Sequence, residues 1–124
     1  MSQKSGKKHI CKVELVVDII GRKWNLIIIW HLRNETLRFS ELQNLLCGIN
    51  SKTITRHLRD LEKHTIITRK VFPEVPPRVE YTLTRQGKAV LPIIEAMMLW
   101  GDTYLQPDEM PGCQATEEKE KIPV

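Results

Sequence analysis

Four cations share one face of a predicted helix near the middle of this 124-residue chain. Between Ser51 and Lys63, lysine and arginine recur every three or four residues. At about 100° per residue they fall in one stripe: Lys52, Arg56, Arg59 and Lys63. The opposite, narrow face holds Ile54, Leu58 and Leu61, which we expect to be buried. A helix divided in this way suits contact with the phosphates and base edges of the DNA major groove.

Short hydroxyl side chains stand at the start of the same helix. Ser51, Thr53 and Thr55 are small enough to reach bases or phosphates, and a helix N-terminus itself attracts phosphate. Earlier in the chain, Lys23 begins another predicted helix, where its ammonium could neutralise a further phosphate. We therefore predict that all these residues belong to one DNA-binding surface.

A predicted hairpin follows the basic helix. The runs 66–72 and 79–83 are rich in β-forming residues, and the loop between them contains Pro73, Pro76 and Pro77. Proline cannot donate to a sheet ladder and restricts the backbone, so the loop should form a stiff wing. Arg78 flanks the tip of this wing and is predicted to face DNA.

Positive charge is unevenly distributed along the chain. The formal net charge is +4, yet the C-terminal segment 106–124 carries five acids and only two lysines. Seven basic residues and three acids lie between Asn50 and Arg78, and clustered positive charge favours a polyanion partner. We predict three regions: a flexible basic arm (1–10), one folded domain (11–105) and a disordered acidic tail (106–124). No apolar run is long enough to span a membrane, and we expect a cytoplasmic protein.

The remaining pattern predicts a mostly helical α+β domain. Helices are expected at 13–20, from about 23 to 32, from a Ser40 N-cap to 46, and from a Thr84 cap through Tyr104. A short strand is expected at 38–39, and Asn50 or Ser51 should cap the basic helix. This order describes a winged helix-turn-helix with a two-stranded wing and extra N- and C-terminal helices.

The two terminal helices are more apolar than one packing partner requires. Their side chains cover an arc wider than the roughly 100° stripe of an ordinary surface helix. We predict that the excess forms a homodimer interface, which would place two basic helices about one DNA turn apart. The residues assigned to this interface are Val13, Val16, Val17, Ile94, Met97, Met98, Trp100 and Tyr104.

Several motifs in residues 11–101 resemble the HxlR-type family of bacterial winged-helix regulators. They are Ile20-Gly21-Arg22-Lys23-Trp24, Arg38-Phe39-Ser40-Glu41-Leu42, Leu58-Arg59-Asp60-Leu61-Glu62, Pro73-Glu74-Val75-Pro76-Pro77-Arg78-Val79-Glu80-Tyr81, and Trp100-Gly101. The resemblance implies a homodimer that binds operator DNA and regulates nearby genes. It also implies that the basic helix enters the major groove while Arg78 approaches the minor groove. The chain departs from the family at Thr65-Ile66-Ile67, where Gly-Leu-Ile is usual.

The resemblance gives Cys11 a candidate role. Some members of the family use a cysteine at this place to sense oxidants or electrophiles. Cys11 lies beside Lys8 and Lys12 at the start of a predicted helix, and both features are typical of reactive cysteines. The hypothesis of a redox sensor, acting through an intersubunit disulfide, stands beside that of a packed structural thiol. The three cysteines are too far apart for a short-spaced zinc motif.

No set of residues predicts catalysis. The chain lacks a glycine-rich phosphate loop, paired carboxylates, and a nucleophile with a base at a recognisable spacing, so we predict no enzyme, no metal site and no cofactor. The favoured function is a sequence-specific regulator, most simply a repressor, on a roughly palindromic operator, with an oxidant or small molecule as a candidate effector. Two alternatives remain: a winged helix used for protein contact, and a non-specific architectural protein that binds nucleic acid.

Overall fold

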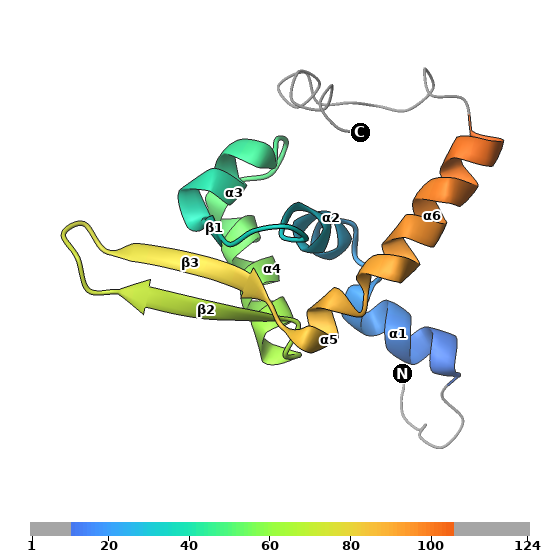
Figure 1. Cartoon of the computed structure of the whole chain (residues 1–124), viewed down its shortest axis with the longest axis horizontal. Coiled ribbons are helices and arrows are strands. Elements are labelled where there is room, and N and C mark those ends of the chain that lie inside the picture. The colour runs from blue at the N-terminus through green and yellow to red at the C-terminus, as the bar shows by residue number, and fades with distance from the viewer. Residues whose placement is uncertain (1–10, 106–124) are drawn as a thin grey trace.

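A computed structural model describes residues 11–105 of the chain. The predicted basic arm and acidic tail lie outside these residues. Within them the elements are α1 (Lys12–Ile20), α2 (Lys23–His31), β1 (Leu37–Arg38), α3 (Phe39–Leu45), α4 (Ser51–Lys63), β2 (Ile67–Phe72), β3 (Arg78–Leu83), α5 (Arg85–Lys88) and α6 (Leu91–Tyr104). The predicted winged helix-turn-helix, mostly helical with a small sheet, is confirmed (Figure 1).

Helix α2 is the centre of the core, as its apolar sequence predicted. Ile28 and Ile29 are fully buried, and α2 contacts both α4 and α6. Helix α4 packs inward through Ile54, Leu58 and Leu61, the three residues predicted for its buried face. The position of α4 is thus fixed by apolar contacts along its whole length, which leaves its other side free for a partner.

The helix-turn-helix consists of α3 and α4, with one boundary different from the prediction. Sequence predicts Ser40 as the N-cap of α3, but the helix begins at Phe39, so the cap lies two residues earlier. The capping position is Arg38, whose backbone N–H donates to the Glu41 carboxylate over 2.8 Å. The Glu41 side chain, in the first turn of α3, therefore accepts from the backbone N–H of the capping residue Arg38, and the helix begins without a hydroxyl side chain at its cap. Asn50 caps α4 as predicted, accepting from the Thr53 N–H at 2.9 Å.

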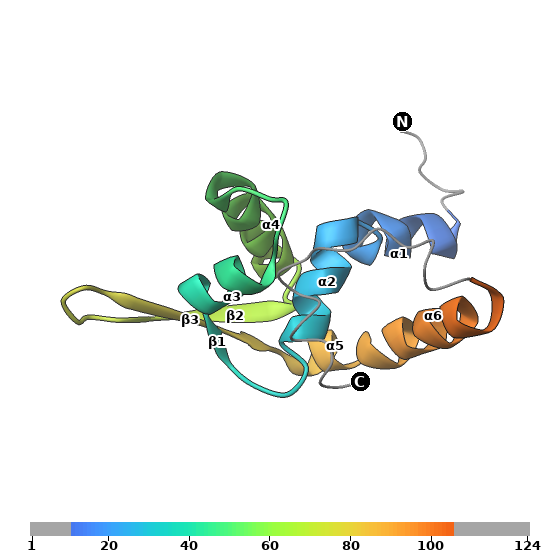
Figure 2. The ribbon, with the colours of Figure 1, turned by 90° about the horizontal axis from the view of Figure 1, so that it is seen from above.

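The hairpin is part of a three-stranded antiparallel sheet in the order β1-β3-β2. The two strands of the predicted wing are therefore joined by a third, because Leu37 pairs with Tyr81 and Arg38 with Glu80. Strand β2 pairs with β3 from Ile67 opposite Leu83 to the last pair before the wing loop. The far end of the hairpin extends well beyond the helices (Figures 1 and 2).

The predicted single C-terminal helix is in fact two helices. Thr84 caps only the four-residue α5, accepting from the Gly87 N–H at 3.0 Å, and α6 begins at Leu91. Pro92 explains the break, because it has no N–H and its ring would clash with the carbonyl of Lys88 in a continuous helix. A Cβ on Gly87 would lie 2.2 Å from the Ile66 carbonyl oxygen, so only glycine lets α5 pack this closely against the strand.

No helix within residues 11–105 is long and apolar enough to cross a membrane.

The end of α4 has a residue in an unfavourable conformation. Thr65 has a φ of 63°, in the left-handed region that a β-branched side chain rarely adopts. The backbone nevertheless closes a Schellman motif, with Ile66 N–H donating to the Leu61 carbonyl at 2.9 Å and Thr65 N–H to the Glu62 carbonyl at 3.0 Å.

Thr65→Gly should therefore stabilise the protein. Relief of the strain at Thr65 exceeds the extra entropy that glycine gains on unfolding, and we expect a rise of about 1 kcal/mol in the free energy of unfolding. Urea denaturation measures it. Thr68→Gly, in the extended strand β2, is the matched control and should be destabilising. A Thr65→Gly protein no more stable than wild type would show that Thr65 is unstrained.

Candidate nucleic-acid interface

The exposed side of α4 carries the predicted cationic stripe. Lys52, Arg56, Arg59 and Lys63 are all exposed, on the side opposite the buried Ile54, Leu58 and Leu61. Among residues 11–105, none of these four cations forms an ion pair. Their charge is thus available to an anionic partner.

The hydroxyl residues at the start of α4 lie together but differ in exposure. Ser51 is exposed, whereas Thr53 and Thr55 are half-buried. The Thr55 hydroxyl donates to the Ser51 backbone carbonyl over 2.9 Å, so it is held against the helix. Ser51 is the hydroxyl most open to a ligand at this end. Lys23 lies elsewhere, at the first residue of α2, with its ammonium 4.9 Å from the centre of the Trp24 ring.

A buried polar network fixes the orientation of α4. Asn25 of α2 is fully buried, and its amide oxygen accepts a hydrogen bond of 2.8 Å from Nδ1 of His57. Its amide nitrogen donates to Asp60 Oδ2 at 3.1 Å and to the Ile19 carbonyl at 3.2 Å. One side chain of α2 therefore joins the end of α1 to two positions of α4. His57 is itself buried, beside the apolar face of α4.

The surroundings of α4 perturb the pKa of one of its own residues, His57. Burial lowers the pKa of His57, and the nearby guanidinium groups of Arg56 and Arg22 act in the same direction, against Asp60. The lowered pKa favours the neutral imidazole ring, which still donates through Nδ1 to Asn25. The proximity of Arg22 brings another exposed cation to α4 from the N-cap of α2, one not predicted from sequence.

A groove of about 660 Å³ separates the wing from the helix-turn-helix. Its lining includes Arg38 and Ser40 at the start of α3, Thr55 of α4, Arg69 of β2 and Arg78 of β3. Burial raises the pKa of Tyr81 in this lining, against the opposing charges of Arg69 and Arg59.

Sequence reasoning did not assign Arg38, Ser40 and Arg69 to the candidate interface, whose groove they line. Arg38 and Ser40 belong to the Arg-Phe-Ser-Glu-Leu motif, from which we predicted only a short strand at Arg38 and a helix N-cap at Ser40. Arg69 pairs with Glu62 of α4 across 3.5 Å, a contact between strand and helix that spacing alone does not reveal.

Arg78 is the predicted site residue with the most contacts. Its guanidinium lies 3.0 Å from Glu74, 3.2 Å from Glu80 and 3.8 Å from the centre of the Phe72 ring. The side chain is thus engaged within the wing, unlike the four cations of α4.

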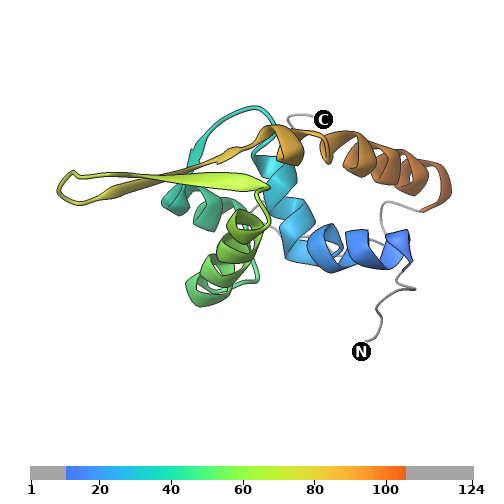
Figure 3. The same ribbon diagram turned by 90° about the horizontal axis from the view of Figure 1, so that it is seen from below.

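An exposed apolar surface lies at the end of the molecule opposite the wing. Seven of the eight residues predicted for a dimer interface are between 43% and 69% exposed: Val13, Val16, Val17, Met97, Met98, Trp100 and Tyr104. They come from α1 and α6, which both project from the body at the end away from the wing (Figures 2 and 3). Ile94 was assigned wrongly, because it is 7% exposed and belongs to the core of its own chain. It lies on the inner face of α6, which the width of the apolar arc did not distinguish from the outer face.

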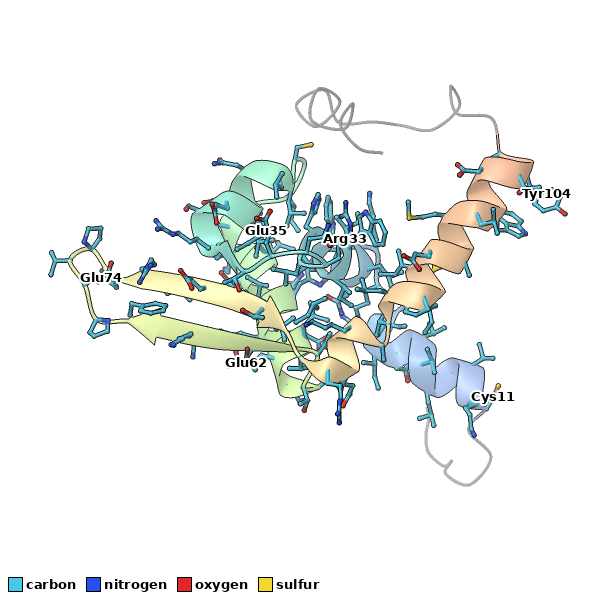
Figure 4. All side chains as sticks on the ribbon, viewed as in Figure 1. Cys11, Arg33, Glu35, Glu62, Glu74 and Tyr104 are labelled. Atoms are coloured by element: carbon cyan, nitrogen blue, oxygen red, sulfur yellow. The ribbon has the colours of Figure 1, made fainter. Side chains whose placement is uncertain are left out.

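Cys11 lies at the outer end of α1, near the end of the molecule that carries Tyr104 (Figure 4). It is a free, exposed thiol at the N-cap position, and its backbone N–H donates to Glu14 Oε1 at 3.2 Å. The structure therefore leaves the sulfur accessible. Within residues 11–105, no group of three histidine, cysteine or acidic side chains could hold a metal ion.

Comparison with known proteins gives a consistent picture. The family model described as HxlR-like helix-turn-helix matches residues 19–109. An uncharacterized HTH-type transcriptional regulator of Methanothermobacter thermautotrophicus is 44% identical over 108 residues, covering 87% of this chain and 82% of the relative.

Two solved structures are also similar. The redox regulator HypR in its oxidized form is 38% identical with a TM-score of 0.72, covering 77% of this chain and 99% of HypR. The reduced form of the transcriptional regulator YodB from Bacillus subtilis is 32% identical with a TM-score of 0.68, covering 79% of this chain and 97% of YodB.

Proposed function

The chain belongs to the HxlR-like helix-turn-helix family and is a DNA-binding transcriptional regulator rather than an enzyme; from this we propose that it acts as a homodimeric repressor on a roughly palindromic operator. The observation that supports this most directly is the exposed stripe of four cations on α4, which no acid within residues 11–105 neutralises. In the proposed complex α4 lies in the major groove, with Ser51, Thr53 and Thr55 near the bases.

The residues around the stripe extend the proposed contact. Arg38 and Ser40 line the groove beside α4, so a DNA backbone leaving the major groove could follow it toward the wing. Arg69 adds a cation to the lining of this groove, Arg22 adds one near His57 of α4, and Lys23 adds one at the start of α2. Phosphate contacts supply affinity without sequence information, whereas the first turns of α4 supply specificity.

The dimer is proposed from the apolar surface of α1 and α6. A surface with Met97, Met98, Trp100 and Tyr104 exposed together is larger than scattered apolar residues would give, and such patches mark interaction sites. A second copy of the chain is the occupant that a palindromic operator requires, because a two-fold axis then relates two α4 helices.

DNA binding should be tight, specific and steeply dependent on salt. If a dimer neutralises about eight phosphates, the logarithm of the association constant should fall with that of the salt concentration with a slope near −7. Arg56→Ala should weaken binding roughly tenfold and make the slope shallower by about two, because each dimer loses two cations. Fluorescence anisotropy with duplex from the gene's own upstream region measures both.

Lys88→Ala is the matched control, since it removes an exposed cation from α5 rather than from α4. It should leave the affinity nearly unchanged. Equal, weak binding of wild type to the upstream and scrambled duplexes would support an architectural protein instead. Affinity that does not respond to Arg56→Ala or Arg59→Ala would support a winged helix used for protein contact.

Trp100→Glu should convert the dimer into a monomer. The substitution places a charge in the centre of the proposed apolar interface, where it would be desolvated without a partner. Analytical ultracentrifugation should show half the wild-type mass, and operator affinity should fall because the two half-sites no longer bind together. Val75→Glu adds the same charge at an even more exposed apolar site in the wing and should remain dimeric. A dimeric Trp100→Glu protein would place the interface elsewhere.

We further propose Cys11 as an oxidant sensor, because the sulfur is exposed on α1 and the similar protein HypR is a redox regulator. Diamide takes two hydrogens from two thiols and leaves a disulfide. Two Cys11 residues of a dimer would supply both sulfurs, and the new bond would reposition the α1 helices.

Operator affinity of wild type should fall at least tenfold after diamide, and dithiothreitol should restore it. Cys11→Ser should be insensitive, as measured by anisotropy with mass spectrometry to identify the oxidised sulfur. A Cys11→Ser protein that still responds fully to diamide would eliminate Cys11 as the sensor.

A further inference from the structure

Arg78 closes the end of the hairpin. It is the first residue of β3 and pairs with Phe72, the last residue of β2, so the two residues bracket the wing loop. Its Nη2 lies 3.0 Å from the Glu74 carboxylate inside that loop, and its Nη1 lies 3.2 Å from Glu80 two residues along β3. The guanidinium thus joins the loop to the strand. Figure 4 shows Glu74 at the far end of the hairpin.

The guanidinium is packed rather than extended into solvent. The Arg78 side chain is 25% exposed and stacks 3.8 Å from the centre of the Phe72 ring. Its Nε is buried and makes no hydrogen bond within residues 11–105. Arginine suits this position because a planar fork can bind two carboxylates while its face lies on an aromatic ring.

Acids offset most of the positive charge at this end of the wing. Glu80 pairs in register with Lys70, whose ammonium lies 5.0 Å from the centre of the same Phe72 ring. Glu74 and Glu80 match the charges of Lys70 and Arg78, and Arg38, which pairs in register with Glu80 from β1, adds one further cation. An Arg78 side chain that turned toward a phosphate would leave two carboxylates unpaired beside a polyanion, which is electrostatically unfavourable.

The loop itself is held at Glu74 in two ways. The Glu74 backbone N–H donates to the Phe72 carbonyl at 2.7 Å while its carboxylate binds Arg78. The next residue, Val75, projects outward and is 99% exposed. Holding Glu74 therefore also determines where Val75 points.

From these contacts we infer that Arg78 is a positioning residue of the wing: it holds the loop 73–77 in the shape that meets DNA, and it does so through Glu74, Glu80 and Phe72 rather than by binding a phosphate. This inference rests on the proposed DNA-binding function. It revises the direct contact that sequence predicted for Arg78.

The two roles predict opposite effects of Glu74→Gln on operator affinity, measured by anisotropy over a range of salt. With a positioning role, the loop loses an anchor and binding weakens roughly three- to tenfold, although an acid near DNA has been removed. Arg78→Lys should weaken binding to a similar extent, because lysine keeps the charge but not the fork. The salt slope should stay unchanged in both, and the double variant should be little weaker than either single one. Glu35→Gln controls for the loss of one acid.

With direct phosphate contact, Glu74→Gln would tighten binding and Arg78→Lys would be nearly neutral. Arg78→Ala would then make the salt slope shallower by about two per dimer. Any of these results would overturn the inference.

Hydrogen exchange of the free protein decides the same question without DNA. Arg78→Lys and Glu74→Gln should speed exchange of the amides at 74–80, while the midpoint of thermal unfolding stays close to wild type. Unchanged exchange in this segment would overturn the positioning role whatever the DNA results. Wild type that binds no duplex would refute the proposed function, and the exchange data would still test the role of Arg78.

Discussion

The arrangement of this protein depends on one buried amide. Asn25 lies in the middle of the core and satisfies the Ile19 carbonyl, Asp60 and His57 with its own two polar atoms. A buried polar group without partners would be costly, so any displacement of α4 or of the end of α1 must either keep these bonds or lose their contribution. Apolar contacts along α4 tolerate small rotations, but directional hydrogen bonds do not. The orientation of the cationic stripe is consequently set from the core, on the side away from DNA.

The two parts of the interface use electrostatics in different ways. On α4, four cations have no acidic partner within residues 11–105, and in the proposed complex they attract the DNA backbone, to which their long side chains can adapt. In the wing, paired charges cancel and serve internal geometry, so that a stiff, proline-containing loop presents Val75. A loop already ordered loses little entropy on binding. In this division the helix contributes attraction and the wing contributes shape.

Most of the structure that could be predicted follows from the periodic spacing of apolar and charged residues. The stripe of α4 and its buried face follow from helical geometry, because each side chain there is either clearly charged or clearly apolar. The features that sequence reasoning missed depend on contacts between residues that are far apart in the chain or that composition does not distinguish. Asn25 looked like one polar residue in an apolar helix, since its partners lie 6 to 35 residues away. Ile94 is apolar, like the exposed Met97, Met98 and Trp100, so composition could not separate core from surface. Arg78 carries a charge, and only the structure shows that Glu74 and Glu80 engage it.

Helix α1 connects the proposed sensor to the DNA-binding helix. Cys11 stands at its exposed first end, and the carbonyl of Ile19 in its last turn accepts from Asn25. A helix of nine residues is stiff, so a disulfide that moved Cys11 would tilt or rotate its whole length. The Asn25 side chain would then either follow the Ile19 carbonyl and lose its hydrogen bonds to Asp60 and His57, or lose its hydrogen bond to Ile19. Either outcome changes the hydrogen-bond network of Asn25 that fixes the orientation of α4. The route from the proposed sensor thiol to α4 thus runs through a single polar side chain, that of Asn25.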